Sequence, residues 1–462
     1  MCWEAPSPST TMTGIDKWPG FLGRPTSIFP LVIFRMAFGA LLCFSQLRFI
    51  YNGWVEACFT DPGFHFTYQF FPWVRPFDTT VMYFLVAFSA LFALMMAVGL
   101  YYRLAAAAFF ILFTYLELVE KAWYLNHYYL VSLLAFLLIW LPAHRKYSLD
   151  AARSDALRAD TVPAWTILLL QAQLALVYFF GGLAKLKADW LWEAQPLRIW
   201  LHARADLPLL GGILDHEFTA FLFSWGGMLF DLGIPFLLFH RKTRLWAYLL
   251  VVVFHTITGL LFPIGMFPWI MTGCTLIFFT EQEWQNIPAY IRPRLPSTPT
   301  LTENHRIAPA TASFLLVYLL LQLSLPLRHF LYTDHILWSE NGFRFSWHVM
   351  VMEKSGFTEF TVVDHENGKK FVVYPSAYLT PIQERQMSFQ PDMIWQFAHF
   401  LGEQYAGEDT SNVSVYVRNK VSLNGRTSGT LLDPEADLMA IPSMNAVYDA
   451  VLAPEEGPPP PR

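Results

Sequence analysis

The sequence predicts an α-helical polytopic membrane protein with about nine transmembrane helices and a small C-terminal α+β domain on the outer face. The first observation is composition: 55% of the 462 residues are hydrophobic and only 15% are charged, whereas soluble domains carry about 25% charged residues. The second is a series of long apolar segments, and the third is a change to strand-like alternation after Arg328. Lipid is the solvent that such an excess of apolar surface requires.

Nine segments are apolar enough to be read as membrane helices, which need about 20 residues each. The stretch from Arg244 to Glu281 is uncharged but too long for one crossing, so Pro263 and Gly265 are expected to divide it into two helices joined by a tight turn. The predicted spans are 28–47, 80–100, 104–120, 125–142, 163–184, 217–239, 245–262, 265–280 and 308–327.

The basic residues between these spans predict the orientation, because Lys and Arg collect in cytoplasmic loops. With the N-terminus in the cytoplasm, each basic cluster falls on the inner side, and everything after Arg328 lies outside, on the periplasmic or extracytoplasmic side. The inner loops then hold Arg103, Arg145, Lys146, Arg153, Arg158, Arg241, Lys242, Arg244, Arg292, Arg294 and Arg306.

Four regions follow from this pattern. Residues 1–26 are expected to form a polar, mobile leader without a cleavable signal, and residues 27–327 the helical membrane domain. Residues 328–445 are expected to form the outer domain, and residues 446–462, which end in APEEGPPPPR, a disordered tail.

Three patterns within residues 328–445 predict a small α+β fold. Residues 358–374 alternate around Asn367-Gly368, which is a strong hairpin signal. Residues 390–405 read as an amphipathic helix, and the valines of residues 413–417 alternate with polar residues, as in a half-buried strand.

Some classes of function are disfavoured. The net charge of −5 suggests no nucleic-acid partner. The four cysteines, Cys2, Cys43, Cys58 and Cys274, show no metal-binding spacing, so no metal is expected. No internal repeat is visible, which weakens a transporter of the inverted-repeat type.

Ionisable groups inside a span are costly and are therefore functional candidates. Arg35 is expected to face the bundle interior and tie helices together. Glu117 and Lys121 lie four residues apart and are expected to form a structural pair on one helix face. His255 lies in the middle of a span and is favoured as a buried hydrogen-bonding residue. His127, at the outer start of a span, is either a satisfied polar group or a group that transfers protons near neutral pH.

Lys185 ends the uncharged segment that follows Asp160. A lysine at a helix end commonly extends its charge to the interface. Two features favour catalysis instead: Gly181-Gly182 allows close approach of a backbone or ligand, and Asp189-Trp190 suggests a turn with an interfacial anchor. A buried amine loses solvation of its charged form, and the neutral amine can accept a proton. The residues alone leave the two possibilities balanced.

The segment YFFGGLAKLKADWLWEAQPLRIWL resembles the membrane core of vitamin K-dependent γ-glutamyl carboxylases and their bacterial relatives, a region also called the horizontally transferred transmembrane domain. Further similar segments follow the same order along the family: FRMAFGALL, YLNHYYL, FHTITGLLFPIGMFPWIM and PLRHFLYTDHILWSENGFRFSWHVMVMEK, with LLDPEADL near the family's outer-domain ending. Together they span roughly residues 20–440 and make the chain similar to a short, bacterial-type member.

This resemblance implies a reaction. In the family, reduced vitamin K, a lipid hydroquinone, is deprotonated and reacts with O₂, and the oxygenated product becomes a strong base. That base removes a γ-proton from a glutamate of a peptide or protein, and the carbanion adds CO₂. The products are γ-carboxyglutamate and vitamin K epoxide. The family needs no metal.

The resemblance also assigns roles to residues of this chain. Lys185 matches the lysine that deprotonates the hydroquinone, and His127 matches a histidine that assists in the same site, with Asn126 beside it. Trp347 and Met350 are expected to line the quinone site, and His255 is a weaker assignment. An intramembrane pocket would exclude the water that a strong base cannot tolerate.

Two departures keep alternatives open. First, Lys187 replaces the more usual acidic or amide residue of the lysine motif. Second, the chain ends soon after Asp433, whereas animal members continue with a longer region, and this difference puts propeptide recognition in doubt. The alternatives are a quinol epoxidase without peptide carboxylation and a non-catalytic quinone-binding or transport protein. The presence of both Lys185 and His127 favours chemistry.

Overall fold

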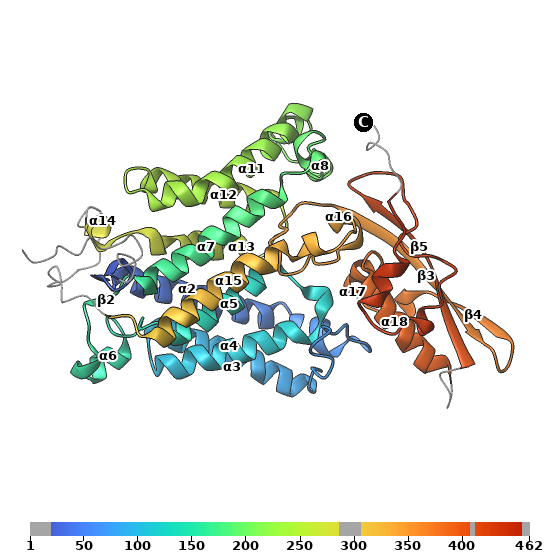
Figure 1. Ribbon diagram of the computed structural model, residues 1–462, viewed down its shortest axis with the longest axis horizontal. Coiled ribbons are helices and arrows are strands. Elements are labelled where there is room, and N and C mark those ends of the chain that lie inside the picture. Colours follow the sequence, from blue (N-terminus) through green and yellow to red (C-terminus); the bar gives the residue numbers. More distant parts are fainter. Residues whose placement is uncertain (1–19, 286–305, 407–411, 455–462) are drawn as a thin grey trace, which may run out of the picture.

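The computed structural model describes residues 20–285, 306–406 and 412–454. Figure 1 shows long helices running side by side in one bundle, with a sheet-containing domain at one end and short elements at the other. The predicted fold class, a helical membrane protein with a small C-terminal α+β domain, is confirmed.

The bundle contains every predicted span as a helix. In the described ranges, seven helices are long and apolar enough to cross a membrane: α2 (Phe29–Tyr51), α3 (Thr79–Val98), α4 (Tyr102–Val119), α7 (Trp165–Ala184), α11 (Glu217–Phe239), α12 (Arg244–Leu261) and α15 (Pro309–Leu327). The fourth and eighth predicted spans are shorter apolar helices, α5 (Asn126–Trp140) and α13 (Phe267–Cys274) with the 3-10 turn η4 (Thr275–Phe278). The count of nine crossings therefore stays a prediction.

Local chemistry sets several helix ends. The Asp78 side chain accepts a hydrogen bond from the Val81 amide and begins α3, and Gly99 ends it at a φ of +67°, a conformation that costs glycine little. As predicted, the uncharged stretch after Arg244 is two helices: α12 ends at Leu261, Pro263 and Gly265 form the break, and α13 begins at Phe267.

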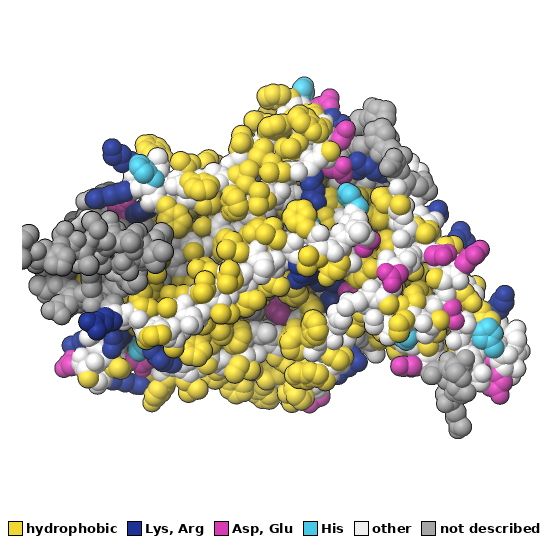
Figure 2. All heavy atoms as spheres, in the orientation of Figure 1, with side chains coloured by type: hydrophobic (Ala, Val, Ile, Leu, Met, Phe, Trp, Pro, Cys, Tyr) yellow, Lys and Arg dark blue, Asp and Glu magenta, His cyan; other side chains and the backbone are white. Residues whose placement is uncertain are grey.

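The sides of the bundle are apolar. Figure 2 shows hydrophobic side chains covering this face of the helices, while charged side chains gather toward both ends. Large exposed apolar residues come from many different helices, among them Phe44, Phe84, Leu104, Trp246, Leu260 and Leu316. A surface of this kind is stable against lipid tails and not against water.

The end of the bundle opposite the sheet domain is built from short elements (Figure 1): strands β1 (Pro25–Ser27) and β2 (Thr161–Pro163), and helices α6 (Leu149–Arg153), η3 (Asp155–Leu157) and α14 (Glu281–Gln285). Strand β1 pairs antiparallel with β2. The expected leader of residues 1–26 is therefore too long, because its last residues belong to the fold; residues 1–19 lie outside the described part.

Arg35 ties this end together, as predicted. Its side chain is fully buried, and its guanidinium donates hydrogen bonds to the backbone oxygens of Ala143 (2.8 Å) and Tyr147 (2.5 Å) in the loop after α5. Backbone acceptors thus satisfy the two terminal nitrogens, which the bilayer could not, while Nε has no partner among the described residues.

Short helical elements also lie near the other end of the bundle, between or beside the long helices. They are η1 (Glu56–Thr60), η2 (Lys121–Trp123), α8 (Ala188–Leu191), α9 (Leu197–His202), α10 (Gly211–Leu214) and η5 (Arg328–Leu331).

The C-terminal domain is a three-stranded antiparallel sheet of order β4-β3-β5 packed against helices. Its elements are α16 (Ile336–Ser339), β3 (Lys354–Asp364), β4 (Lys369–Val373), η6 (Pro375–Ala377), α17 (Pro381–Met387), α18 (Pro391–Tyr405), β5 (Val413–Leu423), η8 (Leu438–Ala440) and η9 (Ala446–Ala450). The predicted hairpin, helix and strand are all present. The hairpin loop is longer than a two-residue turn, since Asp364 pairs with Lys369 and Gly368 ends the loop at a φ of +65°.

The expected disordered tail begins too early. Within residues 446–454, Val447 is fully buried and Val451 forms a β-bridge with Leu432. The Trp338 indole also donates to the Leu452 oxygen (2.8 Å). Apolar side chains in this segment complete the core of the sheet domain, so its described part extends to residue 454; residues 455–462 lie outside the described residues.

The boundary at residue 328 is also not a clean separation. The loop of residues 340–352 turns back from the sheet domain, and its Trp347 is buried in the main core of the helical bundle. Four non-glycine residues of this loop adopt left-handed backbone conformations: Glu340, Phe345, Trp347 and Met350. Such conformations persist only where the surroundings hold them, and they concentrate at functional sites.

Candidate active site

Lys185 lies where α7 ends, and its partner is a carboxylate that the sequence analysis did not consider. Its Nζ donates to Asp231 Oδ2 of α11 (2.7 Å) and to the Gly181 oxygen (3.1 Å), and lies 3.5 Å from the Val349 oxygen. Both side chains are buried, with exposed fractions of 6% and 12%. Lys185 is therefore one half of a buried ion pair.

The two glycines before Lys185 explain how the pair forms. A Cβ on Gly182 would lie 2.9 Å from the Leu232 backbone nitrogen, closer than real Cβ atoms approach, so α7 and α11 can meet here only at a glycine. A Cβ on Gly181 would lie 3.6 Å from Asp231 Oδ2. The expectation that Gly181-Gly182 allows the close approach of another backbone is confirmed.

Lys185 and Asp231 line a small cavity of about 70 Å³, which we call the Lys185 cavity. This volume holds a few water molecules or one small group. His255 of α12 also lines it: its Nε2 lies 3.0 Å from the Tyr178 hydroxyl, and its Nδ1 has no hydrogen-bond partner among the described residues. His255 thus combines the expected buried hydrogen bond with a free nitrogen.

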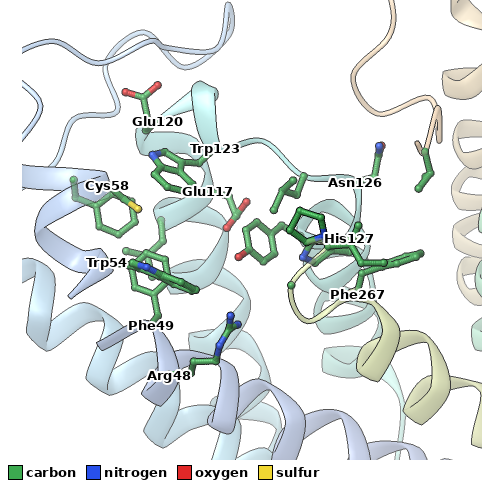
Figure 3. A pocket seen from close by; sticks show the side chains of 18 of the residues that line it. Arg48, Phe49, Trp54, Cys58, Glu117, Glu120, Trp123, Asn126, His127 and Phe267 are labelled. Carbon is green, nitrogen blue, oxygen red and sulfur yellow. The ribbon is translucent and has the colours of Figure 1, made fainter. Parts of the chain in front are cut away.

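His127 lines a different and larger cavity of about 540 Å³, which we call the His127 cavity. This volume falls in the range of small-molecule sites. Figure 3 shows Arg48, Phe49, Trp54 and Cys58 on one side of it and His127 with Phe267 on the other. The His127 side chain is 6% exposed, and its Nε2 has no partner among the described residues.

Asn126 belongs to the same wall. Its amide donates to the His348 oxygen (3.3 Å), and its oxygen accepts from the Tyr124 hydroxyl (3.1 Å). The bond to His348 connects the start of α5 to the loop of residues 340–352.

The two cavities share a wall, so Lys185 and His127 are neighbours in adjacent cavities rather than in one. The residues that line both cavities are Ile264, Phe267, Val349 and Met350. The Phe267 ring lies 5.8 Å from the His127 ring and 5.5 Å from the His255 ring, centroid to centroid. Phe267 is thus the aromatic partition between the two histidines.

Met350 and Trp347 have different places. Met350 lines both cavities. Trp347 lines neither: it is 1% exposed and stacks on Tyr129, with ring centroids 5.0 Å apart. It anchors the loop that brings Val349 and Met350 to the site.

The expected pair of Glu117 and Lys121 is wrong. Helix α4 ends at Val119, so the two residues do not share a helix face. Lys121 instead forms a buried ion pair with Asp392 of α18 (3.0 Å), while Glu117 lines the His127 cavity.

Asp231 is a candidate functional residue that the sequence analysis missed. A signal was present, since Asp231 is the only charged residue inside α11 after its first residue, and buried intramembrane carboxylates are functional candidates. Lys187 takes no part in either cavity; it is half-buried, and burial lowers the pKa of its amine. Across the described ranges, no group of three or more His, Cys, Asp or Glu side chains is arranged to hold a metal ion.

The fold and the site define a class: a multi-pass membrane protein with two adjoining cavities, one large enough for a ligand and one for a few water molecules, whose walls include the loop of residues 340–352. Residues 23–284 match the family model of the HTTM domain, and residues 307–450 match that of the vitamin K-dependent gamma-carboxylase lumenal domain. The chain therefore belongs to the vitamin K-dependent γ-glutamyl carboxylase family. No solved structure matches it.

Proposed function

We propose that this protein couples the oxygenation of a lipid hydroquinone, reduced vitamin K or a close relative, to the carboxylation of glutamate in a peptide or protein. The observation that carries the proposal is the Lys185–Asp231 pair, buried beside a cavity of quinol size. Family membership supports the reaction class. Bound reduced vitamin K would supply, with O₂, the strong base that carboxylation of a glutamate γ-carbon requires.

The two cavities suit this chemistry in different ways. Aromatic and aliphatic side chains line most of the His127 cavity, which fits a flat apolar ring, and the unpartnered His127 Nε2 offers such a ring a hydrogen bond. The Lys185 cavity is too small for a ring, but it has room for a proton-transfer group next to one.

Asp231 gives Lys185 a route to the neutral amine. A proton on Lys185 Nζ has an acceptor 2.7 Å away in Asp231 Oδ2, so it can move to the carboxylate without leaving the buried pair. Transfer within the pair leaves a free electron pair on Nζ, which can then take a proton from a hydroquinone hydroxyl. No proton has to cross the bilayer for the base to form.

The test is a coupled assay. Protein purified in detergent receives reduced vitamin K, O₂, bicarbonate and a glutamate-rich peptide, and both epoxide and carboxylated peptide are measured. Lys185→Ala should lower both products by about 10²–10⁴-fold, the usual contribution of a general base. Lys187→Ala, two residues away and outside both cavities, is the matched control and should retain activity.

The possible outcomes separate the candidate functions. Both products from the wild type support the proposal. Epoxide without carboxylated peptide points to a quinol epoxidase that does not carboxylate peptides. Neither product from well-folded protein would leave a quinone-binding or transport role, and full activity of Lys185→Ala would refute the assignment of the base.

A further inference from the structure

The His127 cavity holds more unpartnered polar groups than the proposed chemistry uses. Besides His127 Nε2, the Trp123 indole nitrogen is buried with no partner among the described residues. Glu117 also lines this cavity, and within the described residues its carboxyl group has no hydrogen-bond or ion-pair partner, although Arg48 lines the same cavity. Polar groups without partners that converge on one cavity are candidates for binding a ligand there.

A comparison of Glu117 with Glu120 sharpens the point. Glu120 lies three residues further on, and its carboxylate accepts hydrogen bonds from the Phe66 amide (3.3 Å), the Ala122 amide (2.9 Å) and the Gln383 side chain (2.7 Å). Glu120 therefore has a structural role. Glu117 is half-buried, and Figure 3 shows its carboxyl group inside the cavity, between Trp123 and His127.

The chemistry of a hydroquinone requires a second polar partner. Its two hydroxyl groups point away from opposite sides of the ring, so one protein group cannot bind both. In the His127 cavity, His127 comes from α5 and Glu117 from the last turn of α4, and aromatic side chains line the space around them. Two polar groups from different helices, in an apolar cavity, are the arrangement that orients a flat ligand.

We propose that Glu117 is a further substrate-binding residue, whose carboxyl oxygen accepts a hydrogen bond from one hydroxyl of a hydroquinone while the ring lies against His127. This inference rests on the proposed function. A ligand of the same shape without O–H groups would leave Glu117 unpaired in an apolar place, which is costly. Glu117 thereby makes the cavity selective for the reduced, hydroxyl-bearing form of its ligand.

Anaerobic calorimetric titration tests binding without turnover. The probes are reduced menadione and its 1,4-dimethyl ether, which has the same ring but no O–H donor. Wild-type protein should bind the hydroquinone more tightly than the ether. Glu117→Leu should weaken hydroquinone binding by about tenfold, as for the loss of one hydrogen bond to a carboxyl group, and should abolish the preference.

Two further variants serve as controls for the effect of Glu117→Leu on binding. Glu117→Gln retains an acceptor oxygen and should keep most of the preference. Glu366→Leu, on the exposed hairpin loop of the outer domain, is the control for loss of an acidic residue and should bind as the wild type does. The thermal midpoint of each variant should match that of the wild type.

The outcomes distinguish this inference from the function on which it rests. If the wild type prefers the hydroquinone and Glu117→Leu shows the same preference, the role of Glu117 is overturned and the proposed function stands. If the wild type binds neither probe, both the role of Glu117 and the proposed function are refuted. A preference lost in Glu117→Leu and kept in Glu117→Gln establishes the role.

Discussion

The ion pair between Lys185 and Asp231 makes each residue dependent on the other. Both side chains lie between membrane helices, where water cannot solvate a single charge. The same pair supplies the proposed base with its proton acceptor, so its contributions to stability and to catalysis have to be separated by experiment.

Replacing Lys185 by Met should lower the free energy of unfolding by about 3–5 kcal/mol, because Asp231 then remains buried without a cation. The double variant with Asp231→Asn removes that charge and should recover most of the stability but none of the activity. Thermal unfolding in detergent and epoxide formation measure the two effects. Equal unfolding midpoints for the single and double variants would contradict the coupling.

Glu120 predicts a pH dependence of stability. Burial raises the pKa of its carboxyl group from 4.5 to about 7, although the bonds from Ala122, Gln383 and Phe66 and the charge of Lys121 oppose the shift. Between pH 4.5 and 7 the folded protein thus holds a proton that the unfolded chain has released. The free energy of unfolding should therefore fall as pH rises through this window, by up to about 3 kcal/mol.

The measurement is the thermal midpoint across this pH range for the wild type and for Glu120→Gln. The variant has no titrating group at residue 120, so its midpoint should vary less with pH. If the thermal midpoints of the two proteins changed with pH in the same way, Glu120 would not be the cause of the pH dependence of stability.

At the residue level, the sequence allowed some roles to be predicted and hid others. Arg35 was predictable because a charge inside a span must find acceptors. The partner of Lys121 was not, since Asp392 lies 271 residues further along the chain and only the fold brings the two together. The roles of Glu117 and Asp231 were hidden for the same reason, because their surroundings depend on which helices pack against each other.

Among the elements, the loop of residues 340–352 determines the shape of the site. Its left-handed residues turn the chain sharply, Trp347 anchors it in the bundle core, and Val349 and Met350 reach both cavities. No periodic pattern predicts such a loop, because its conformation is imposed by the helices around it. The membrane helices, by contrast, were predicted to within a few residues, since lipid imposes a simple requirement of length and apolarity.

Phe267, at the start of α13, lies in the wall between the two cavities, so its removal should change the ratio of the two products. Phe267→Ala should open a passage between the His127 and Lys185 cavities and admit water. Water that reaches a strong base quenches it before it meets the glutamate. Epoxide should therefore form in several-fold excess over carboxylated peptide. The control is Phe84→Ala, on the exposed side of α3; an unchanged product ratio in Phe267→Ala would refute the partition.

For the whole molecule, buried polar contacts fix the sheet domain on the bundle. Asp392 forms ion pairs with both Lys121 (3.0 Å) and Arg344 (2.7 Å). These two cations hold the pKa of its carboxyl group below its usual value despite burial. Asp189 is held by Arg426 through two bonds of 2.7 and 2.8 Å. The sheet domain is thus positioned by specific charges as well as by apolar packing.

The proposed orientation predicts a labelling pattern. In a background with all four cysteines replaced by serine, a membrane-impermeant maleimide should label Glu366→Cys, on the outer domain, in sealed right-side-out vesicles. It should label Arg241→Cys, in the exposed loop between α11 and α12, only after permeabilisation. The reverse pattern would place the N-terminus outside.

The loop that buries Trp347 in the bundle has a consequence for how the protein is made. The membrane helices from Phe29 to Leu327 all precede Trp347 in the chain, so the helices are synthesised before the segment that fills this part of their core. Only when the later segment has emerged and folded back can the space around Lys185 be closed. Biogenesis thus ends with a sealing step, and a chain interrupted before residue 347 would keep its buried lysine and aspartate open to the surroundings.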